Sequence, residues 1–169
     1  MTVTLMKNCT YCEHGDEILT IFNYAIEHTT ALYEYEPRTD AVIKAWFEGK
    51  TEQNYPVIGA FTPDGTLMGF ATYGRFRPQP AFQYTVEHSV YLNPDYFGQG
   101  IAALLMEEII RQAKEQGYHV MVGAIDAENS ASIRLHEKLG FNAAGLITQS
   151  GYKFDRWLDL AFYQLLLTE

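Results

Sequence analysis

One segment in the middle of the chain constrains the fold more than any other. A predicted strand at Tyr84–Leu92 leads through a turn that contains Gly98 and Gly100 directly into an amphipathic helix that extends to Gln116. The two glycines allow a tight main-chain path and expose N–H groups that no Cβ obstructs. Together with the positive end of the helix, these groups suit a pyrophosphate, and a simple strand–helix turn is the alternative interpretation.

The flanking segments predict a single mixed α/β domain over residues 1–169. The Pro63-Asp64-Gly65 turn, between two apolar runs, predicts a β-hairpin. From the periodicities of about 2 and 3.6 residues, strands are expected at 2–7, 32–36, 57–61, 67–73, 119–125, 141–150 and 157–167, and helices at 16–26, 40–48 and 129–139.

Charge and hydropathy exclude several classes of partner. The net charge is −9 and no basic run occurs, so a nucleic-acid surface is not expected. No stretch approaches the roughly 18–20 apolar residues that cross a bilayer, and no membrane partner is expected. The N-terminal residues lack the pattern of a signal peptide, so a cytoplasmic location is expected.

A dinucleotide-binding turn and a zinc site fit this sequence less well than the pyrophosphate-binding turn. A dinucleotide-binding turn would follow the first strand and carry a third glycine, where this chain has Ala103. Cys9 and Cys12 form a lone CxxC with His14 close by, without the further ligands of a zinc site. We interpret them as two reduced cysteines in a loop and expect no metal.

Two blocks carry a resemblance to a known superfamily. The Val90–Ala102 turn, followed by a strand and then by Asn129–Phe141 with its Leu-Gly-Phe end, resembles the GNAT superfamily of acetyl-CoA-dependent N-acetyltransferases. The blocks Tyr84–Leu92 and Gly151–Leu160 resemble, more narrowly, the phosphinothricin and methionine sulfoximine acetyltransferases. The resemblance covers nearly the whole chain and implies a GNAT-type α/β fold, with a mostly antiparallel central sheet flanked by about four helices, and a homodimer.

The resemblance also implies a set of cofactor-binding residues. The strand edge around Val90 would pair with the pantetheine amides and supply a main-chain N–H to the oxyanion. One departure is Phe97, which stands where the family usually has Arg or Gln. The implied contacts to acetyl-CoA are Val90, Tyr91, Leu92, Phe97, Gly98, Gln99, Gly100, Ile101, Ala102, Asn129 and Lys138.

Glu87 is the candidate general base. An α-amine with a pKa near ~8 is mostly protonated at neutral pH, so the reaction needs a proton acceptor. Strand alternation puts Glu87 on one face with Thr85, Ser89 and Tyr91, and the family match implies the same role. His88 would face the other way in a structural role, with a subunit contact as one option.

His136 has two open interpretations. It occupies the place where many relatives in the wider superfamily have a tyrosine that protonates the departing thiolate, and an imidazole can do the same. Alternatively, it is a helix histidine that is bonded to a backbone carbonyl.

The acceptor is expected to be a small amine that carries a carboxylate. Arg75 and Arg77 can grip such a group, and the resemblance places Arg75, Phe76, Arg77, Thr85, Val86 and Glu87 on the acceptor side. Methionine sulfoximine, methionine sulfone and phosphinothricin fit this description. Solvated arginines, another amine such as a protein N-terminus, and a non-catalytic acyl-CoA-binding protein remain alternatives.

Overall fold

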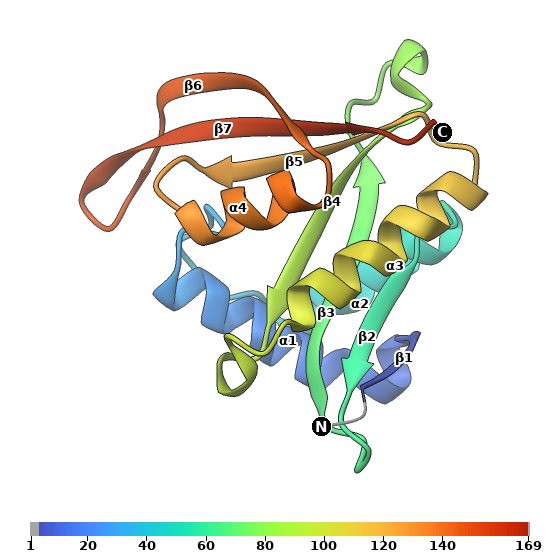
Figure 1. The fold of residues 1–169 in the computed structure, drawn as a ribbon. Helices are drawn as coiled ribbons and strands as arrows, with labels where there is room; N and C mark the ends of the chain where they lie inside the picture. The colour runs from blue at the N-terminus through green and yellow to red at the C-terminus, as the bar shows by residue number, and fades with distance from the viewer. Residues whose placement is uncertain (1–3, 169) are drawn as a thin grey trace.

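A computed structural model describes residues 4–168 of the chain (Figure 1). The predicted strand at 2–7 begins outside the described residues. The helices and strands are β1 (Leu5–Asn8), α1 (Tyr11–His28), α2 (Asp40–Glu52), β2 (Val57–Phe61), β3 (Leu67–Arg75), β4 (Thr85–Leu92), α3 (Ile101–Glu115), β5 (Val120–Asp126), α4 (Ser130–Lys138), β6 (Asn142–Lys153) and β7 (Arg156–Leu166), with short 3-10 turns at Pro80–Phe82 and Pro94–Tyr96.

The strands form one seven-stranded sheet in the order β1-β2-β3-β4-β5-β7-β6. Every neighbouring pair is antiparallel except β4 and β5, which are parallel. This arrangement, with four α-helices among the described residues, confirms the expected mostly antiparallel α/β architecture.

Helices cover both faces of the sheet (Figure 1). On one face, α3 packs on β2, β3 and β4 through fully buried Leu105, Met106 and Ile109. On the other, α1 and α2 enclose a second cluster that contains Ile18, Phe22 and Phe70. Because strand side chains alternate, successive residues of β4 belong to different layers.

Two predicted boundaries of helices are wrong. Helix α1 begins at Tyr11 rather than Asp16, because Thr10 caps it by accepting a hydrogen bond from the Glu13 amide at 3.3 Å. The CxxC is therefore not wholly in a loop: Cys9 is buried before the helix and Cys12 is exposed in its first turn. Helix α2 continues through Gly49 to Glu52.

The predicted strand at 32–36 is also wrong. Residues 29–39 form an irregular connection between α1 and α2, although apolar and polar side chains alternate in it. Both main-chain groups of Arg38 are bonded to the Asn23 side chain, at 2.8 and 3.1 Å, rather than to a strand. The alternation reflects a segment that packs on two sides, which a single sequence cannot distinguish from a strand.

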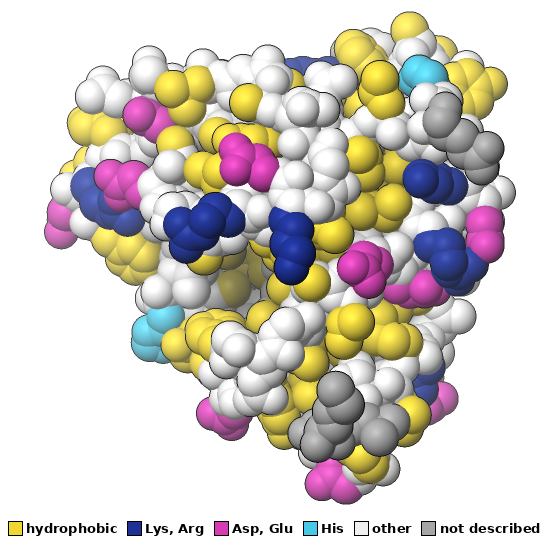
Figure 2. Space-filling model, viewed as in Figure 1, with side chains coloured by type: hydrophobic (Ala, Val, Ile, Leu, Met, Phe, Trp, Pro, Cys, Tyr) yellow, Lys and Arg dark blue, Asp and Glu magenta, His cyan; other side chains and the backbone are white. Residues whose placement is uncertain are grey.

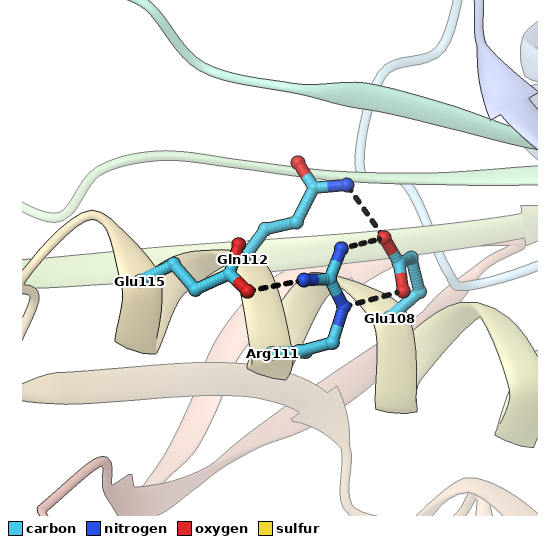
Figure 3. Close-up of polar contacts among 4 residues, drawn as sticks. All are labelled: Glu108, Arg111, Gln112 and Glu115. Atoms are coloured by element: carbon cyan, nitrogen blue, oxygen red, sulfur yellow. Dashed lines mark hydrogen bonds and ion pairs between the residues drawn. The ribbon is translucent and has the colours of Figure 1, made fainter.

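The outer face of α3 carries a charged network (Figure 3). Arg111 binds Glu108 in a bidentate manner, at 3.0 and 2.6 Å, and also contacts Glu115 one turn later. Gln112 adds a bond of 2.7 Å to Glu108. Exposed pairs of this kind stabilise a helix by only a few tenths of a kcal/mol each.

Candidate active site

The two parallel strands at the centre of the sheet separate partway along their length (Figure 1). They pair only from Thr85 opposite Val120 to Glu87 opposite Val122. Beyond this point β4 continues to Leu92 beside β3, while β5 continues beside β7. We call the opening between β4 and β5 the split.

The main chain of β4 presents free polar groups to the split. The Asn93 N–H donates to Met68 O at 2.9 Å and the Phe76 N–H donates to Thr85 O at 3.4 Å, so the odd-numbered residues of β4 direct their backbone groups toward β3. Alternation then directs the N–H and C=O groups of His88, Val90 and Leu92 into the split. Tyr91, which was expected to bind the cofactor, has its backbone groups on the β3 side and offers only its side chain.

A cleft of about 690 Å³ opens from the split. Figure 2 shows it as a hollow with hydrophobic side chains at its depth. Its walls come from α1, the connection after α1, β4, the glycine turn, β5 and α4. The predicted site residues that line it are Val90, Tyr91, Leu92, Phe97, Gly98, Ala102, Asn129 and His136.

The glycine turn meets the cleft at the start of α3. Gly98 and Gly100 have φ values of +74° and +76°, which L side chains rarely adopt. Gly100 is the N-cap, and no side chain caps the helix. Within residues 4–168, the N–H groups of Gly98, Gln99 and Gly100 donate to no other protein group, and the first N–H groups of α3 have no partner inside the helix. This is a cluster of main-chain donors suited to an anion.

Three predicted residues of this turn differ in where their side chains lie. Ile101 is 4% exposed and its side chain lies in the core, so only its N–H can face a ligand. Gln99 is exposed and is not in the cleft wall. Phe97 is exposed, and its ring centroid lies 6.3 Å from that of Tyr24 at the cleft wall.

Asn129 and Lys138 occupy different parts of α4. The Asn129 side-chain oxygen caps the helix by accepting from the Ser132 N–H at 3.1 Å, so its amide nitrogen remains to donate into the cleft. Lys138 is exposed in the last turn of α4, outside the cleft wall.

A buried histidine pair sits at the base of the split. His88 and His136 stack with centroids 4.9 Å apart, and their Nε2 atoms are 2.8 Å apart. A Cβ on Gly123 of β5 would lie 2.8 Å from Nε2 of His88, so the glycine makes room for the pair. His88 is 9% exposed and lies in the wall of this cleft, which favours the structural role expected for it.

The hydrogen bonds fix the tautomers of this pair. Nδ1 of His136 lies 2.7 Å from Ser132 O, which can only accept, so Nδ1 carries the hydrogen. His136 Nε2 then accepts from His88 Nε2–H, and His88 Nδ1 remains buried without a partner in the described chain. Burial lowers the pKa of both rings, that of His88 to about 3. The bond from His136 to Ser132 O is the one expected if His136 is a helix histidine bonded to a backbone carbonyl, which was its second interpretation.

Glu87 lies at the last paired position before the split. It is half-buried, and burial raises its pKa, while the charge of Arg77 acts in the opposite direction. Its cross-strand partner is Gly74, where a Cβ would lie 3.3 Å from Nζ of Lys50. A partly desolvated carboxylate with a raised pKa is suited to accept a proton near neutral pH.

The residues predicted to bind the acceptor differ in how well their side chains could reach it. Arg77 lies close enough to act on the Glu87 carboxylate, whereas Arg75 makes only a long contact of 3.5 Å with Pro78 O. Val86 is fully buried beneath α3, so only its main chain could reach an acceptor. Phe76 packs against Phe82, with their ring centroids 5.7 Å apart.

One wall of the cleft was not predicted from the sequence. Tyr24 and Ala25 of α1 and the segment Thr29–Tyr33 contribute to it, as does Asp126 of β5. No local motif identifies them, because they meet only through tertiary packing. The helix start had a usable signal: Thr10-Tyr11-Cys12-Glu13 has the spacing of a capping box.

Comparison with known proteins identifies the family. Residues 20–141 match the model of the Acetyltransferase (GNAT) family. Over 148 residues the chain is 46% identical to the L-methionine sulfoximine/L-methionine sulfone acetyltransferase of Pseudomonas aeruginosa, covering 88% of this chain and 86% of that protein. The chain belongs to the GNAT acetyltransferase family.

Two further relatives are informative about this GNAT acetyltransferase. It is 32% identical over 148 residues to the phosphinothricin N-acetyltransferase of Alcaligenes faecalis, covering 87% of this chain and 75% of that protein. It superposes on yncA of Salmonella typhimurium, solved with its cofactor acetyl-CoA, with a TM-score of 0.95 and 38% identity, over 99% of this chain and 96% of that one. The resemblance seen in the sequence is confirmed.

Residues 4–168 of the GNAT acetyltransferase contain no group of three or more His, Cys, Asp or Glu side chains placed to hold a metal ion. None of the described helices combines the length and apolar content needed to cross a bilayer.

Proposed function

We propose that the protein transfers an acetyl group from acetyl-CoA to the α-amine of a small amino-acid analogue, with Glu87 as general base. One observation carries the proposal: a free backbone edge on β4 leads directly into an uncapped helix N-terminus, and Glu87 lies at the base of that edge. The activities named for the relatives point in the same direction.

Acetyl-CoA fits the free backbone groups of the cleft. The pantetheine amides would pair with the exposed edge of Val90 and Leu92, as an added strand pairs with a sheet. The pyrophosphate would accept from the N–H groups at Gly98–Ala102. Asn129 would donate its amide to the cofactor, whereas Gln99, Phe97 and Lys138 lie outside or at the rim of the cleft and are weaker candidates.

The chemical step would be a direct attack of the amine on the thioester carbon. Glu87 takes a proton from the ammonium form of the acceptor, either directly or through water, and frees the nitrogen lone pair. The carbonyl oxygen becomes an oxyanion, which accepts from a main-chain N–H of Val90 or Leu92. Collapse of the tetrahedral species breaks the C–S bond, and the attacking nitrogen gives up its extra proton to the departing thiolate or to water, which releases CoA and the N-acetylated product.

His136 has a limited part in this proposal. Its Nδ1 hydrogen is held by Ser132 O, and a second proton is disfavoured by burial. A thiolate with a pKa near ~8.5 can leave without a strong enzyme acid. We therefore favour a structural role for His136, in which its pair with His88 holds the base of the split.

The acceptor would be bound through its carboxylate. Arg77 lies on the Glu87 side and offers a planar guanidinium for a bidentate contact, with Arg75 as the second candidate. Methionine sulfone and methionine sulfoximine are favoured over phosphinothricin, because the relative named for the first two is the more similar, at 46% against 32% identity.

The deciding experiment follows CoA release with a thiol reagent across a panel of amines. Methionine sulfoximine and methionine sulfone are expected to be turned over, and their methyl esters are expected to be poor substrates. Equal turnover of acid and ester would favour another amine as acceptor. Acetyl-CoA binding without turnover of any amine would favour a non-catalytic acyl-CoA-binding protein.

A further inference from the structure

The irregular connection between α1 and α2, residues 29–38, forms part of the cleft although it contains no helix or strand of its own. We call it the acceptor loop. We propose that Lys153, at the end of β6, is a positioning residue that holds the acceptor loop in place and so determines how tightly the acceptor binds. The proposal rests on the proposed function.

Lys153 is a buried cation that bonds to the loop backbone. It is 4% exposed, and its ammonium group donates to Thr29 O at 2.8 Å and to Leu32 O at 2.6 Å. None of the ion pairs within residues 4–168 involves it. Two converging carbonyls therefore supply its main polar contacts, and they fix the path of the chain between Thr29 and Leu32.

Neighbouring contacts join the same two segments. The Tyr35 hydroxyl donates to Tyr152 O at 2.5 Å. At Gly151, a Cβ would lie 2.9 Å from Cε2 of Tyr33, so the tyrosine ring packs directly on the glycine. The end of β6 thus contacts the acceptor loop at three successive residues, with Lys153 the buried one.

Packing places the loop against the face of β4 that carries Glu87. The Arg38 guanidinium of the loop lies 4.1 Å from the ring centroid of Phe22, whose centroid lies 5.1 Å from that of Tyr91. Strand alternation puts Tyr91 and Glu87 on the same face of β4, so the loop lies on the side of the candidate base. The pyrophosphate turn contacts the cleft from α3 instead, so loop position should affect the acceptor more than acetyl-CoA.

The test uses the full chain with Lys153→Met, which keeps the length of the side chain and removes its donors. The KM for methionine sulfone is expected to rise about tenfold or more, while the dissociation constant of acetyl-CoA stays within about twofold. Hydrogen exchange should accelerate in residues 29–38 and stay unchanged in α3. Lys153→Arg, which restores donors, should recover part of the acceptor affinity.

Thr62→Val is the matched control. It removes three polar contacts of a buried side chain, to Asp64 and to the N–H and C=O of Thr66, but in the β2–β3 turn. It should leave the acceptor KM unchanged. If Lys153→Met does not fold, Tyr35→Phe removes a neighbouring contact and should raise the acceptor KM to a smaller extent.

The proposal is overturned if loop exchange and acceptor KM match the wild type. It is also overturned if the acetyl-CoA affinity falls as much as that for the acceptor, because that result indicates general damage. If the wild type acetylates no amine, the proposed function fails; unchanged loop exchange in Lys153→Met would then separately refute the role of Lys153.

Discussion

Single side chains at the base of the split have environments that suit different tasks. Glu87 is half-buried beside a glycine and retains access to a cation, so it can exchange a proton. His88, the next residue, points to the other face, where burial lowers its pKa to about 3 and keeps it neutral. Adjacent residues of one strand thus provide a carboxylate that can exchange a proton and an imidazole that stays neutral.

Replacing the candidate base should separate activity from stability. Glu87→Gln is expected to lower kcat by about 10²–10⁴-fold, because the amine loses its proton acceptor. Burial raises the pKa of Glu87, so ionisation destabilises the folded state above that pKa. The melting temperature at neutral pH should therefore stay the same or rise.

Glu107→Gln, at an exposed position on α3, is the control and should change neither kcat nor the melting temperature. A fully active Glu87→Gln enzyme would refute the role of Glu87 as general base.

The histidine pair should make the fold sensitive to acid. The folded-state pKa of His88 is about 3, against an ordinary value of 6.5, so below pH 6.5 the unfolded chain binds a proton that the folded chain does not. Stability is then lost as the pH falls, by about 1.4 kcal/mol per pH unit for one group.

His88→Gln keeps a donor for His136 and removes this titration. Urea unfolding of wild type and variant at pH 7.5 and 5.5 should show a smaller loss of free energy in the variant. Equal losses would show that His88 is not held neutral.

At the scale of elements, most of the fold could be predicted because local patterns and tertiary packing agree. The alternation in β4 and the amphipathic spacing of α3 each match the layer in which their residues are buried. The predicted strand at 32–36 was wrong because the main chain on either side of it, at Thr29 and Arg38, is bonded to Lys153 and Asn23, which are distant in sequence, and not to a neighbouring strand. The histidine pair was missed for the same reason, since β4 and α4 meet only in the folded chain.

The glycine turn supports a prediction with an internal control. Gly100→Ala should lower acetyl-CoA affinity about tenfold, because an L residue at φ +76° costs about 1–2 kcal/mol and moves the N–H groups of the turn. Gly117→Ala places the same strain at the other end of α3, at φ +84°, and nothing would contact either new Cβ within 4 Å. Calorimetric titration should show weaker binding for the first variant only. Equal affinities would argue against binding at this turn.

At the scale of the whole molecule, several large apolar side chains of β6 and β7 are exposed to solvent. Leu146, Ile147, Tyr152 and Trp157 are 45–62% exposed, and β6 is an edge strand with an unpaired side. An exposed strand edge can pair with another chain, and exposed apolar residues can mark an interaction site. For the homodimer expected from the sequence, this surface is the proposed contact.

Sedimentation velocity tests the assembly. The wild type is expected to sediment at twice the chain mass of 19.3 kDa, and Trp157→Asp should shift it toward the monomer by placing a charge in the apolar surface. Val42→Asp, at a residue 48% exposed on α2, should remain dimeric. A monomeric wild type at micromolar concentration would contradict the proposal.

The separation of β4 from β5 has a consequence for how specificity can change. Hydrogen-bonding groups of the peptide backbone are the same whichever side chain they carry, so substitution along this edge leaves the proposed grip on the acyl donor in place. The proposed recognition of the acceptor depends on side chains such as Arg77 and on a loop held by one lysine. Under this proposal, substitutions can change which amine is bound without changing how acetyl-CoA is bound. The specificity for the acceptor can therefore evolve while the acetyl donor stays the same.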